Sequence, residues 1–176
     1  MQVHLSEQEI LRREKMQQLK DLGINPYPAP LYPVSDKTSD IKQNFKEEED
    51  DKQVSLAGRL MIRRIQGSAS FAELQDDKGR IQLYFRRDDI CSDEDKTMYN
   101  TVFKKLVDIG DIIGVKGQVF KTKVGEITIR VNEFTLLSKA LKPLPIVRET
   151  QNEKGETVLH DAFTDSETRY RQRYVD

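Results

Sequence analysis

Apolar and polar residues alternate along residues 54–87, and this alternation organises the middle of the chain. The pattern breaks at Gly67 and again at 77–79, where the sequence is Asp-Lys-Gly, and then resumes. A period of two with breaks of this kind is typical of half-buried strands joined by tight turns. Two similar segments follow later in the chain. We therefore expect strands at about 53–65, 69–76, 79–87, 111–121 and 126–137.

A helical pattern lies between the third and fourth expected strands. Within residues 91–107, Met98, Val102, Phe103 and Leu106 fall on one face of a helix. Three strands, a helix and two strands follow one another in the order of the OB-fold, a five-stranded Greek-key barrel that binds oligonucleotides. The sequence therefore predicts a mainly β fold, α+β by element count, in which this helix closes one end of the barrel.

The first 52 residues carry helix signals of their own. Ser6 with Glu9 three residues later forms a capping box, and Gly23 suits a left-handed cap, so we expect a helix that ends near Leu22. Prolines at 26, 28, 30 and 33 predict an extended segment across the barrel surface, followed by a short helix at 38–45. These signals make residues 1–52 a helical extension and residues 53–142 the barrel domain.

The pattern changes again after residue 142. We expect an extended linker that begins at Pro143, and then a small hairpin around the turn at 152–155. Thr164 and Glu167 form another potential capping box, which predicts the start of a helix at 169–174. We interpret residues 143–176 as a linker and hairpin that lead into a further domain.

Composition narrows the classes of protein. No apolar run approaches the ~20 residues of a membrane span, and the N-terminus lacks the apolar region of a signal peptide, so we expect a cytoplasmic protein without membrane contact. Cys91 is the single cysteine, which excludes an internal disulfide and a cysteine-based zinc site. His4 and His160 lie far apart in the sequence, so no metal site is expected.

The net charge of -1 conceals an uneven distribution. Residues 53–142 contain 16 Lys and Arg against 12 Asp and Glu, whereas the rest of the chain contains 13 against 18. A modest positive field on the barrel would steer a polyanion towards it. An ordinary mixed surface explains the same counts, so charge alone does not identify a ligand.

Four side chains expected on the outer face of the barrel suit single-stranded nucleic acid, and Arg86 is expected near them on the same polar side of the sheet. The ring of Phe71 is suited to stacking on a base, and the Gln82 amide can donate and accept at one base edge. Arg63 and Arg64 are consecutive strand residues that point to opposite faces, so only one can lie beside Phe71. Glu126 follows a turn, where its carboxylate can accept from a base. Taken singly, each is also explained as a core or ordinary surface residue.

Several ordered motifs run through the strand region: Val54-Ser55-Leu56-Ala57-Gly58-Arg59, Arg63-Arg64, Ala69-Ser70-Phe71, Leu74-Gln75-Asp76 and Gly79-Arg80-Ile81-Gln82-Leu83-Tyr84. Together they resemble the anticodon-binding OB domain of class IIb aminoacyl-tRNA synthetases, which charge tRNA with lysine, aspartate or asparagine. Further segments are similar to the bacterial lysyl-tRNA synthetases of that class, at 108–114, 120–126, 136–139, 142–145 and 169–176. The resemblance covers nearly the whole chain.

The resemblance implies roles for the four candidate residues. Phe71 would stack on the central anticodon uridine, and Gln82 would hydrogen-bond a base edge. Arg64 would contact the same base region, and Glu126 would read a neighbouring uridine. The N-terminal helix would contact the anticodon stem through its basic residues, which are Arg12, Arg13, Lys15 and Lys20.

The resemblance also implies what this chain lacks. The class II catalytic motifs that hold ATP, magnesium and lysine do not occur, and neither does a phosphate-binding glycine loop or a nucleophile beside a histidine. We therefore expect the chain to bind tRNA without catalysis, cofactor or metal, as part of a longer homodimeric ligase. Residues 146–164 exceed the family's short linker, and we assign them no function.

Two alternatives remain open. The first is the same domain from an aspartyl- or asparaginyl-tRNA synthetase. The second is a general OB-fold module that binds single-stranded nucleic acid or a protein. Comparing anticodon stem-loops with unrelated oligonucleotides would separate them.

Overall fold

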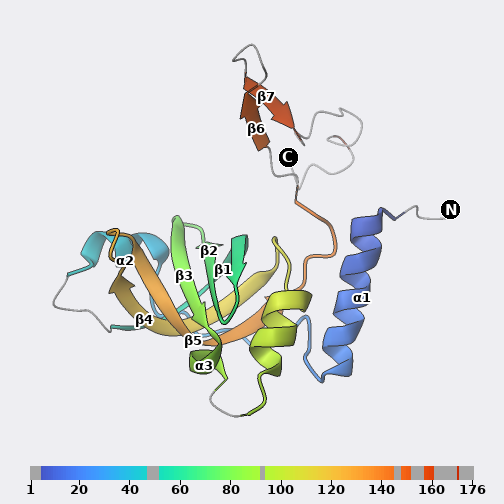
Figure 1. Cartoon of the computed structure of the whole chain (residues 1–176), viewed down its shortest axis with the longest axis horizontal. Helices are drawn as coiled ribbons and strands as arrows, with labels where there is room; N and C mark the ends of the chain where they lie inside the picture. The colour runs from blue at the N-terminus through green and yellow to red at the C-terminus, as the bar shows by residue number, and fades with distance from the viewer. Residues whose placement is uncertain are drawn as a thin grey trace. The chain divides into compact units, whose positions relative to one another are not determined.

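Five strands close into a barrel in the order β1-β2-β3-β5-β4 (Figure 1). Neighbouring strands are antiparallel except β3 and β5, which are parallel. The predicted OB-fold is confirmed, and each strand begins and ends within one residue of its predicted limits. The strands are β1 (Gln53–Gln66), β2 (Ala69–Gln75), β3 (Arg80–Arg86), β4 (Ile112–Lys121) and β5 (Ile127–Ser138).

The structure is a computed structural model that describes residues 5–46, 52–91, 94–144, 148–151, 157–160 and 170. Its contacts divide the chain into two units, Met1–Pro143 and Leu144–Asp176. The second unit contains the predicted hairpin, in which β6 (Arg148–Gln151) pairs antiparallel with β7 (Thr157–His160). The predicted turn at 152–155 and the predicted helix at 169–174, apart from Tyr170, lie outside the described residues.

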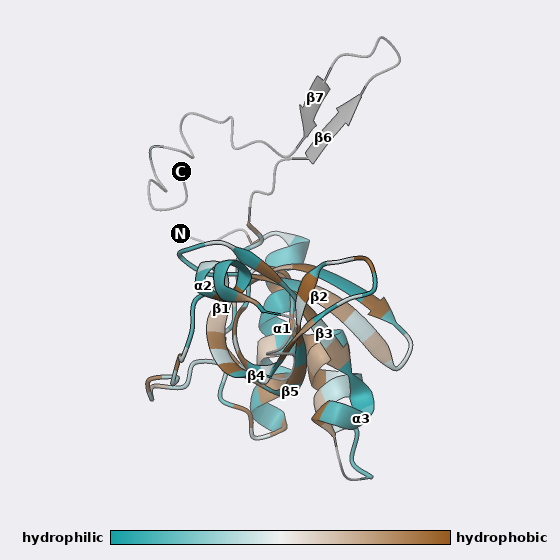
Figure 2. Cartoon of the chain, turned by 90° about the vertical axis from the view of Figure 1, so that its left-hand side faces the viewer, coloured by the Kyte–Doolittle hydropathy of each residue, from teal (hydrophilic) through white to brown (hydrophobic). Residues whose placement is uncertain are grey.

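The barrel interior is filled from alternate positions of the strands, and Figure 2 shows hydrophobic and hydrophilic residues alternating along them. The predicted closing helix is η2 (Met98–Leu106), a π-helix. Its Phe103 ring stacks on Phe85 of β3 with centroids 4.0 Å apart. The buried hydroxyls of Tyr99 and Ser70 are 2.8 Å apart and satisfy one another. A four-residue helix that alternation did not predict, α3 (Arg87–Ile90), joins β3 to this region.

The N-terminal helix α1 (Glu7–Asp21) lies beside η2 on one side of the barrel (Figure 1). The capping box is confirmed, because the Ser6 N–H donates to Glu9 Oε2 over 2.9 Å and the Glu9 N–H donates to Ser6 Oγ over 3.3 Å. Gly23 adopts φ 75°, as a left-handed cap requires. The helix therefore ends at Asp21, close to its predicted end.

Two basic residues of α1 point into the protein. Arg12 is 8% exposed and donates to the backbone carbonyls of Ile109 and Ala140, each over 2.9 Å. Lys15 pairs with Asp108 over 2.5 Å. The expectation that these two side chains contact an anticodon stem is wrong, because their charges are used to hold the helix against the barrel. Arg13 and Lys20 are exposed.

The extended segment after α1 crosses the barrel surface as predicted. Tyr27 donates its hydroxyl to the Lys139 carbonyl over 2.9 Å, and the Ser55 hydroxyl donates to the Pro33 carbonyl over 2.5 Å. Tyr32 lies against β4 at Gly114, where an added Cβ would come within 2.5 Å of its ring. A side chain at position 114 would collide with this ring, so glycine allows Tyr32 to pack directly on the β4 backbone. It leads into α2 (Thr38–Asn44).

A buried network of ion pairs joins α1 to the chain just before β4 and just after β5. The ammonium of Lys139 is fully buried and lies 2.6 Å from Asp108 and 2.8 Å from Asp111, which is also fully buried. Burial alone would raise the pKa of Asp108, but hydrogen bonds from Lys139 and Lys15 outweigh that effect and hold it below its ordinary value. The network links the start of β4, the end of β5 and the N-terminal helix.

Candidate nucleic-acid interface

Strand register brings two of the predicted site residues together on the outer face of the barrel. Arg64 of β1 is the cross-strand partner of Phe71 of β2, and Phe71 is the partner of Tyr84 of β3. Directly paired residues project from the same face of a sheet. Arg64, Phe71 and Tyr84 therefore form a row on the outer face, opposite the buried residues of the same strands.

Aromatic rings extend across the outer face from this row to Phe120 of β4, which lies in the neighbouring row with Gln82 and Thr128. The Phe71 and Tyr84 ring centroids are 5.1 Å apart, and those of Tyr84 and Phe120 of β4 are 6.3 Å apart. All three side chains are partly exposed. We call Phe71, Tyr84 and Phe120 the aromatic strip. The bases of single-stranded nucleic acids stack on partly exposed aromatic rings that follow one another along a protein surface.

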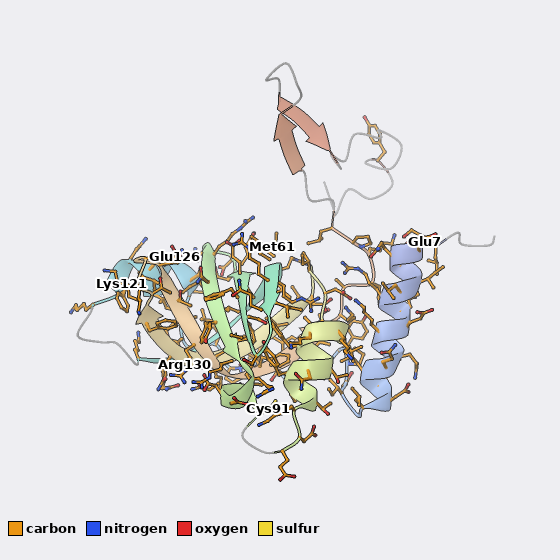
Figure 3. The ribbon with its side chains drawn as sticks, in the orientation of Figure 1. Glu7, Met61, Cys91, Lys121, Glu126 and Arg130 are labelled. Atoms are coloured by element: carbon orange, nitrogen blue, oxygen red, sulfur yellow. The ribbon has the colours of Figure 1, made fainter. Side chains whose placement is uncertain are left out.

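Gln82 and Glu126 lie on the same outer face. Gln82 pairs with Glu73 of β2 and with Thr128 of β5, one row from Phe71. Glu126 precedes Thr128 by two residues at the start of β5, and Figure 3 shows it beside Lys121 near the turn between β4 and β5. The four predicted residues therefore share one face, with Glu126 at its margin. Their contacts with bases remain predictions.

Arg63 takes the opposite direction from Arg64, as the alternation predicts. It donates to the backbone carbonyls of Phe103 and Val107 at the end of η2. Burial lowers the pKa of the Arg63 guanidinium, and the carboxylates of Asp108 and Asp111 oppose that effect. Arg63 is part of the internal structure, whereas Arg64 is exposed.

This pair of neighbouring arginines gives a matched prediction. Arg64→Ala should weaken the binding of single-stranded RNA several-fold and leave the free energy of unfolding unchanged. Arg63→Ala should lower that free energy by about 2 kcal/mol, because two carbonyls lose a charged donor. Urea unfolding and RNA titration of both variants provide the check. If Arg64→Ala and the unsubstituted chain bind RNA with equal affinity, Arg64 does not contribute to the proposed site.

Ion pairs hold several polar side chains around this face. Arg130 of β5 donates to both carboxylate oxygens of Asp89 in α3, over 2.7 and 3.0 Å. Lys42 of α2 lies 3.4 Å from the Glu126 carboxylate, which is about half exposed. The short helices α2 and α3 therefore each supply a partner for a residue on the outer face of β5 or at its start.

Asp76 fixes α2 beside the barrel. Its carboxylate accepts from the backbone N–H of Thr38 over 2.8 Å and from the Thr38 hydroxyl over 2.7 Å. Burial alone would raise the pKa of Asp76, but these bonds and those from the backbone of Lys78 and Gly79 bring it below its ordinary value. Lys42 is thereby kept within reach of Glu126.

Sequence reasoning missed part of this surface. A groove of about 320 Å³ lies beside the aromatic strip and is lined by Tyr84, Arg86, Gln118, Phe120 and Arg130. The alternation places Arg86 on this polar side. Tyr84 lies between Gln82 and Arg86 at alternate positions of the same strand, so it had the same signal and was missed. Phe120 and Arg130 had no such signal, because they come from distant parts of the sequence and reach Tyr84 only through the pairing of β3 with β5 and of β5 with β4.

Within the described part of the chain, no group of three or more His, Cys, Asp or Glu residues is placed to hold a metal ion. No helix among the same residues is long and apolar enough to cross a membrane. The outer face carries aromatic rings, amides, guanidinium groups and the carboxylate of Glu126. These groups recognise bases and phosphates.

Comparison of the sequence with known protein families gives a result consistent with a nucleic-acid-binding surface. Residues 54–137 match the tRNA anticodon family model, which describes an OB-fold nucleic acid binding domain. This segment therefore belongs to the family of tRNA anticodon-binding OB-fold domains, as its motifs predicted.

The similarity to proteins named lysine–tRNA ligase extends over nearly the whole chain. The chain is 59% identical to that of Christiangramia forsetii over 172 residues, which are 98% of this chain and 29% of the relative. The identity to that of Porphyromonas gingivalis is 57% over 176 residues, 99% of this chain and 30% of the relative. The chain is 55% identical to the lysine–tRNA ligase of Azobacteroides pseudotrichonymphae over 172 residues, which are 98% of this chain and 33% of the relative. The chain spans about a third of these relatives, and the predicted resemblance is confirmed.

Proposed function

We propose that the outer face of the barrel binds the anticodon of a lysine tRNA. Phe71 stacks on the central uridine, and Gln82 hydrogen-bonds the edge of that base. Arg64 contacts the same nucleotide, and Glu126 accepts a hydrogen bond from a neighbouring uridine. The observation that carries this proposal is the row of Arg64, Phe71 and Tyr84 on the exposed face of a barrel that matches the anticodon-binding family.

Specificity follows from the polar groups around the ring. Stacking is tolerant of base identity, because every base has an aromatic face. Gln82 and Glu126 add hydrogen bonds that only a base with the right donors and acceptors can complete. A wrong base would leave polar groups unpaired on desolvation, which costs about 1–3 kcal/mol for each group.

We further propose that the chain acts within a larger lysine–tRNA ligase. The relatives are about three times as long as the region they share with it. In the complete enzyme, a homodimer in the cytoplasm, lysine would react with ATP in the presence of magnesium and then pass to the tRNA. The residues for that chemistry would lie outside these 176, so a lysine-dependent ATP–pyrophosphate exchange assay of this chain should give no signal.

Three anticodon stem-loops test the proposal. At one fixed salt concentration, the chain should bind a stem-loop with a UUU anticodon at least about tenfold more tightly than loops with GUC or GUU, since each unmatched base edge costs about 1.4 kcal/mol or more. A preference for GUC or GUU would identify an aspartate or asparagine tRNA instead. Equal binding of all three and of unrelated oligonucleotides would contradict anticodon recognition and indicate a general single-strand binder.

A further inference from the structure

Glu126 has a cationic neighbour to which the proposed function gives no role. The ammonium of Lys42 in α2 lies 3.4 Å from Glu126 Oε1, and the two side chains are 40% and 47% exposed. Figure 3 shows Glu126 next to the ribbon of α2 at the rim of the barrel. A positive and a negative group are therefore open to a ligand at the same place.

The backbone of Glu126 is held by the turn that precedes β5. Its N–H donates to the Thr122 hydroxyl over 3.0 Å, and its carbonyl accepts from the Thr122 N–H over 2.9 Å. The Thr128 hydroxyl donates to the same carbonyl over 3.2 Å. These bonds occupy the backbone groups of Glu126 and leave its carboxylate for Lys42 and a ligand.

Lys42 is held in place by the attachment of α2 to the barrel. Thr38, the first residue of α2, donates twice to the Asp76 carboxylate, over 2.8 and 2.7 Å. Ile41 is 5% exposed and belongs to the hydrophobic core. Lys42 follows Ile41 directly, so its backbone is fixed close to the barrel. Its side chain thus reaches Glu126 from 84 positions earlier in the sequence.

An ammonium beside a carboxylate presents a hydrogen-bond donor next to an acceptor. The ammonium has three N–H donors, and the carboxylate accepts at about four lone-pair positions, so one mutual contact leaves both with free capacity. Their 3.4 Å separation is also longer than the about 2.7–2.9 Å of a strong charge-assisted hydrogen bond. Both groups can therefore turn towards a base while they stay neighbours.

Uracil carries the complementary pair of groups on adjacent positions of one edge. Its O4 accepts a hydrogen bond and its N3–H donates one. Cytosine carries the reverse pair, because its N4 amino group donates and its N3 accepts. A fixed donor and acceptor side by side therefore fit uracil and oppose cytosine, whereas a carboxylate alone could also accept from the cytosine amino group.

From this arrangement we infer that Lys42 is a specificity-determining residue for the uridine that Glu126 contacts. Its ammonium donates to O4 of that base while the Glu126 carboxylate accepts from N3–H. The inference rests on the proposed function, which places a uridine at Glu126. It adds a residue from outside the barrel, because α2 precedes the first strand and completes the recognition of a base at β5.

Replacement of single uridines by cytidine tests this role. The 176-residue chain and its Glu126→Ala, Lys42→Met and Lys42→Arg variants are titrated at one salt concentration with stem-loops that carry UUU, CUU, UCU or UUC. Glu126→Ala identifies the position at which the preference for uridine depends on the carboxylate. At that position alone, Lys42→Met should reduce the preference about 3- to 10-fold, the effect of one hydrogen bond. Lys42→Arg should keep most of it, because a guanidinium also donates.

Lys116→Met is the matched control for the change in charge. It also removes one ammonium from an exposed ion pair, here with Glu133, and it should leave the preference for uridine unchanged at every position. An equal loss for all four loops in Lys42→Met, with a weaker dependence of binding on salt, would mean that Lys42 contacts a phosphate. The inference would then be wrong.

The inference and the proposed function fail in different ways. If Glu126→Ala changes the preference at one position and Lys42→Met does not, Lys42 takes no part in base recognition and only the inference is wrong. If Glu126→Ala changes the preference nowhere, both statements about Glu126 are wrong, and Phe71→Ala decides the rest of the proposed function. The urea midpoints should hardly move, because exposed ion pairs contribute little to stability.

Discussion

Phe71→Ala is expected to weaken binding of the UUU stem-loop about 5- to 150-fold, because the loss of one base–aromatic stack costs roughly 1–3 kcal/mol. The ring lies on the outer face in register with Arg64 and Tyr84, so a bound base would rest on it rather than enter the core. The loss should be measured by fluorescence anisotropy at fixed salt, since phosphate contacts vary with ionic strength.

Phe71→Tyr is the matched control for this result, because it keeps an aromatic face at the same position. It should retain most of the affinity. Phe71→Ala should also leave the urea midpoint of unfolding nearly unchanged, since the side chain is only partly buried. If alanine and tyrosine bind the stem-loop equally well, stacking at this position is not the source of affinity.

Lys139→Met is expected to lower the free energy of unfolding by about 3–5 kcal/mol, because it leaves buried carboxylates without their cation. The ammonium is fully buried between Asp108 and Asp111, and Lys15 remains only for Asp108. Protonation of one carboxyl would relieve part of the cost. Even so, the loss is a large share of the 5–15 kcal/mol typical of a domain.

Lys116→Met serves as the control for this substitution. Lys116 pairs with Glu133 across β4 and β5 over 3.1 Å, and both side chains are about half exposed. A surface pair of this kind contributes about 0–1 kcal/mol, so the urea midpoint should hardly move. Similar losses in the two variants would mean that burial of the network at Lys139 has no special importance for stability.

The strands could be predicted because each has one buried and one exposed face. A period of two is visible in a single sequence, and it placed the ends of all five strands within one residue. The same alternation correctly predicted that Arg63 and Arg64 lie on opposite faces of the strand. The four-residue helix α3 could not be found in this way, since so short an element has less than two turns over which a period can be read.

Long-range contacts explain most of what the sequence did not reveal. Arg12 and Lys15 looked like surface residues because their partners lie about a hundred positions further along the chain, at Ile109, Ala140 and Asp108. The groove was hidden for a similar reason. Strands β3 and β5 pair in parallel, although the 40 residues 87–126 lie between them in the sequence. The local pattern of the sequence predicts on which side of a strand a residue lies. Which residues of different strands become neighbours depends on how the barrel closes.

The resemblance contributed what physical chemistry alone did not. From residue types, Phe71 could have been a core residue and Gln82 an ordinary solvent-facing amide. Motifs along the chain assigned both to a nucleic-acid site, and register then placed them on one face with Tyr84. The base that each residue contacts is still a prediction.

The central claim is that the Phe71 ring stacks on the central base of the anticodon. The most direct test compares the UUU stem-loop with the same loop made abasic at that base, for the unsubstituted chain and for Phe71→Ala at one salt concentration. Removal of the base should weaken binding by the unsubstituted chain about 5- to 150-fold and have almost no effect on the variant. An equal loss in both proteins would show that the base and the ring act independently, and would contradict the claim.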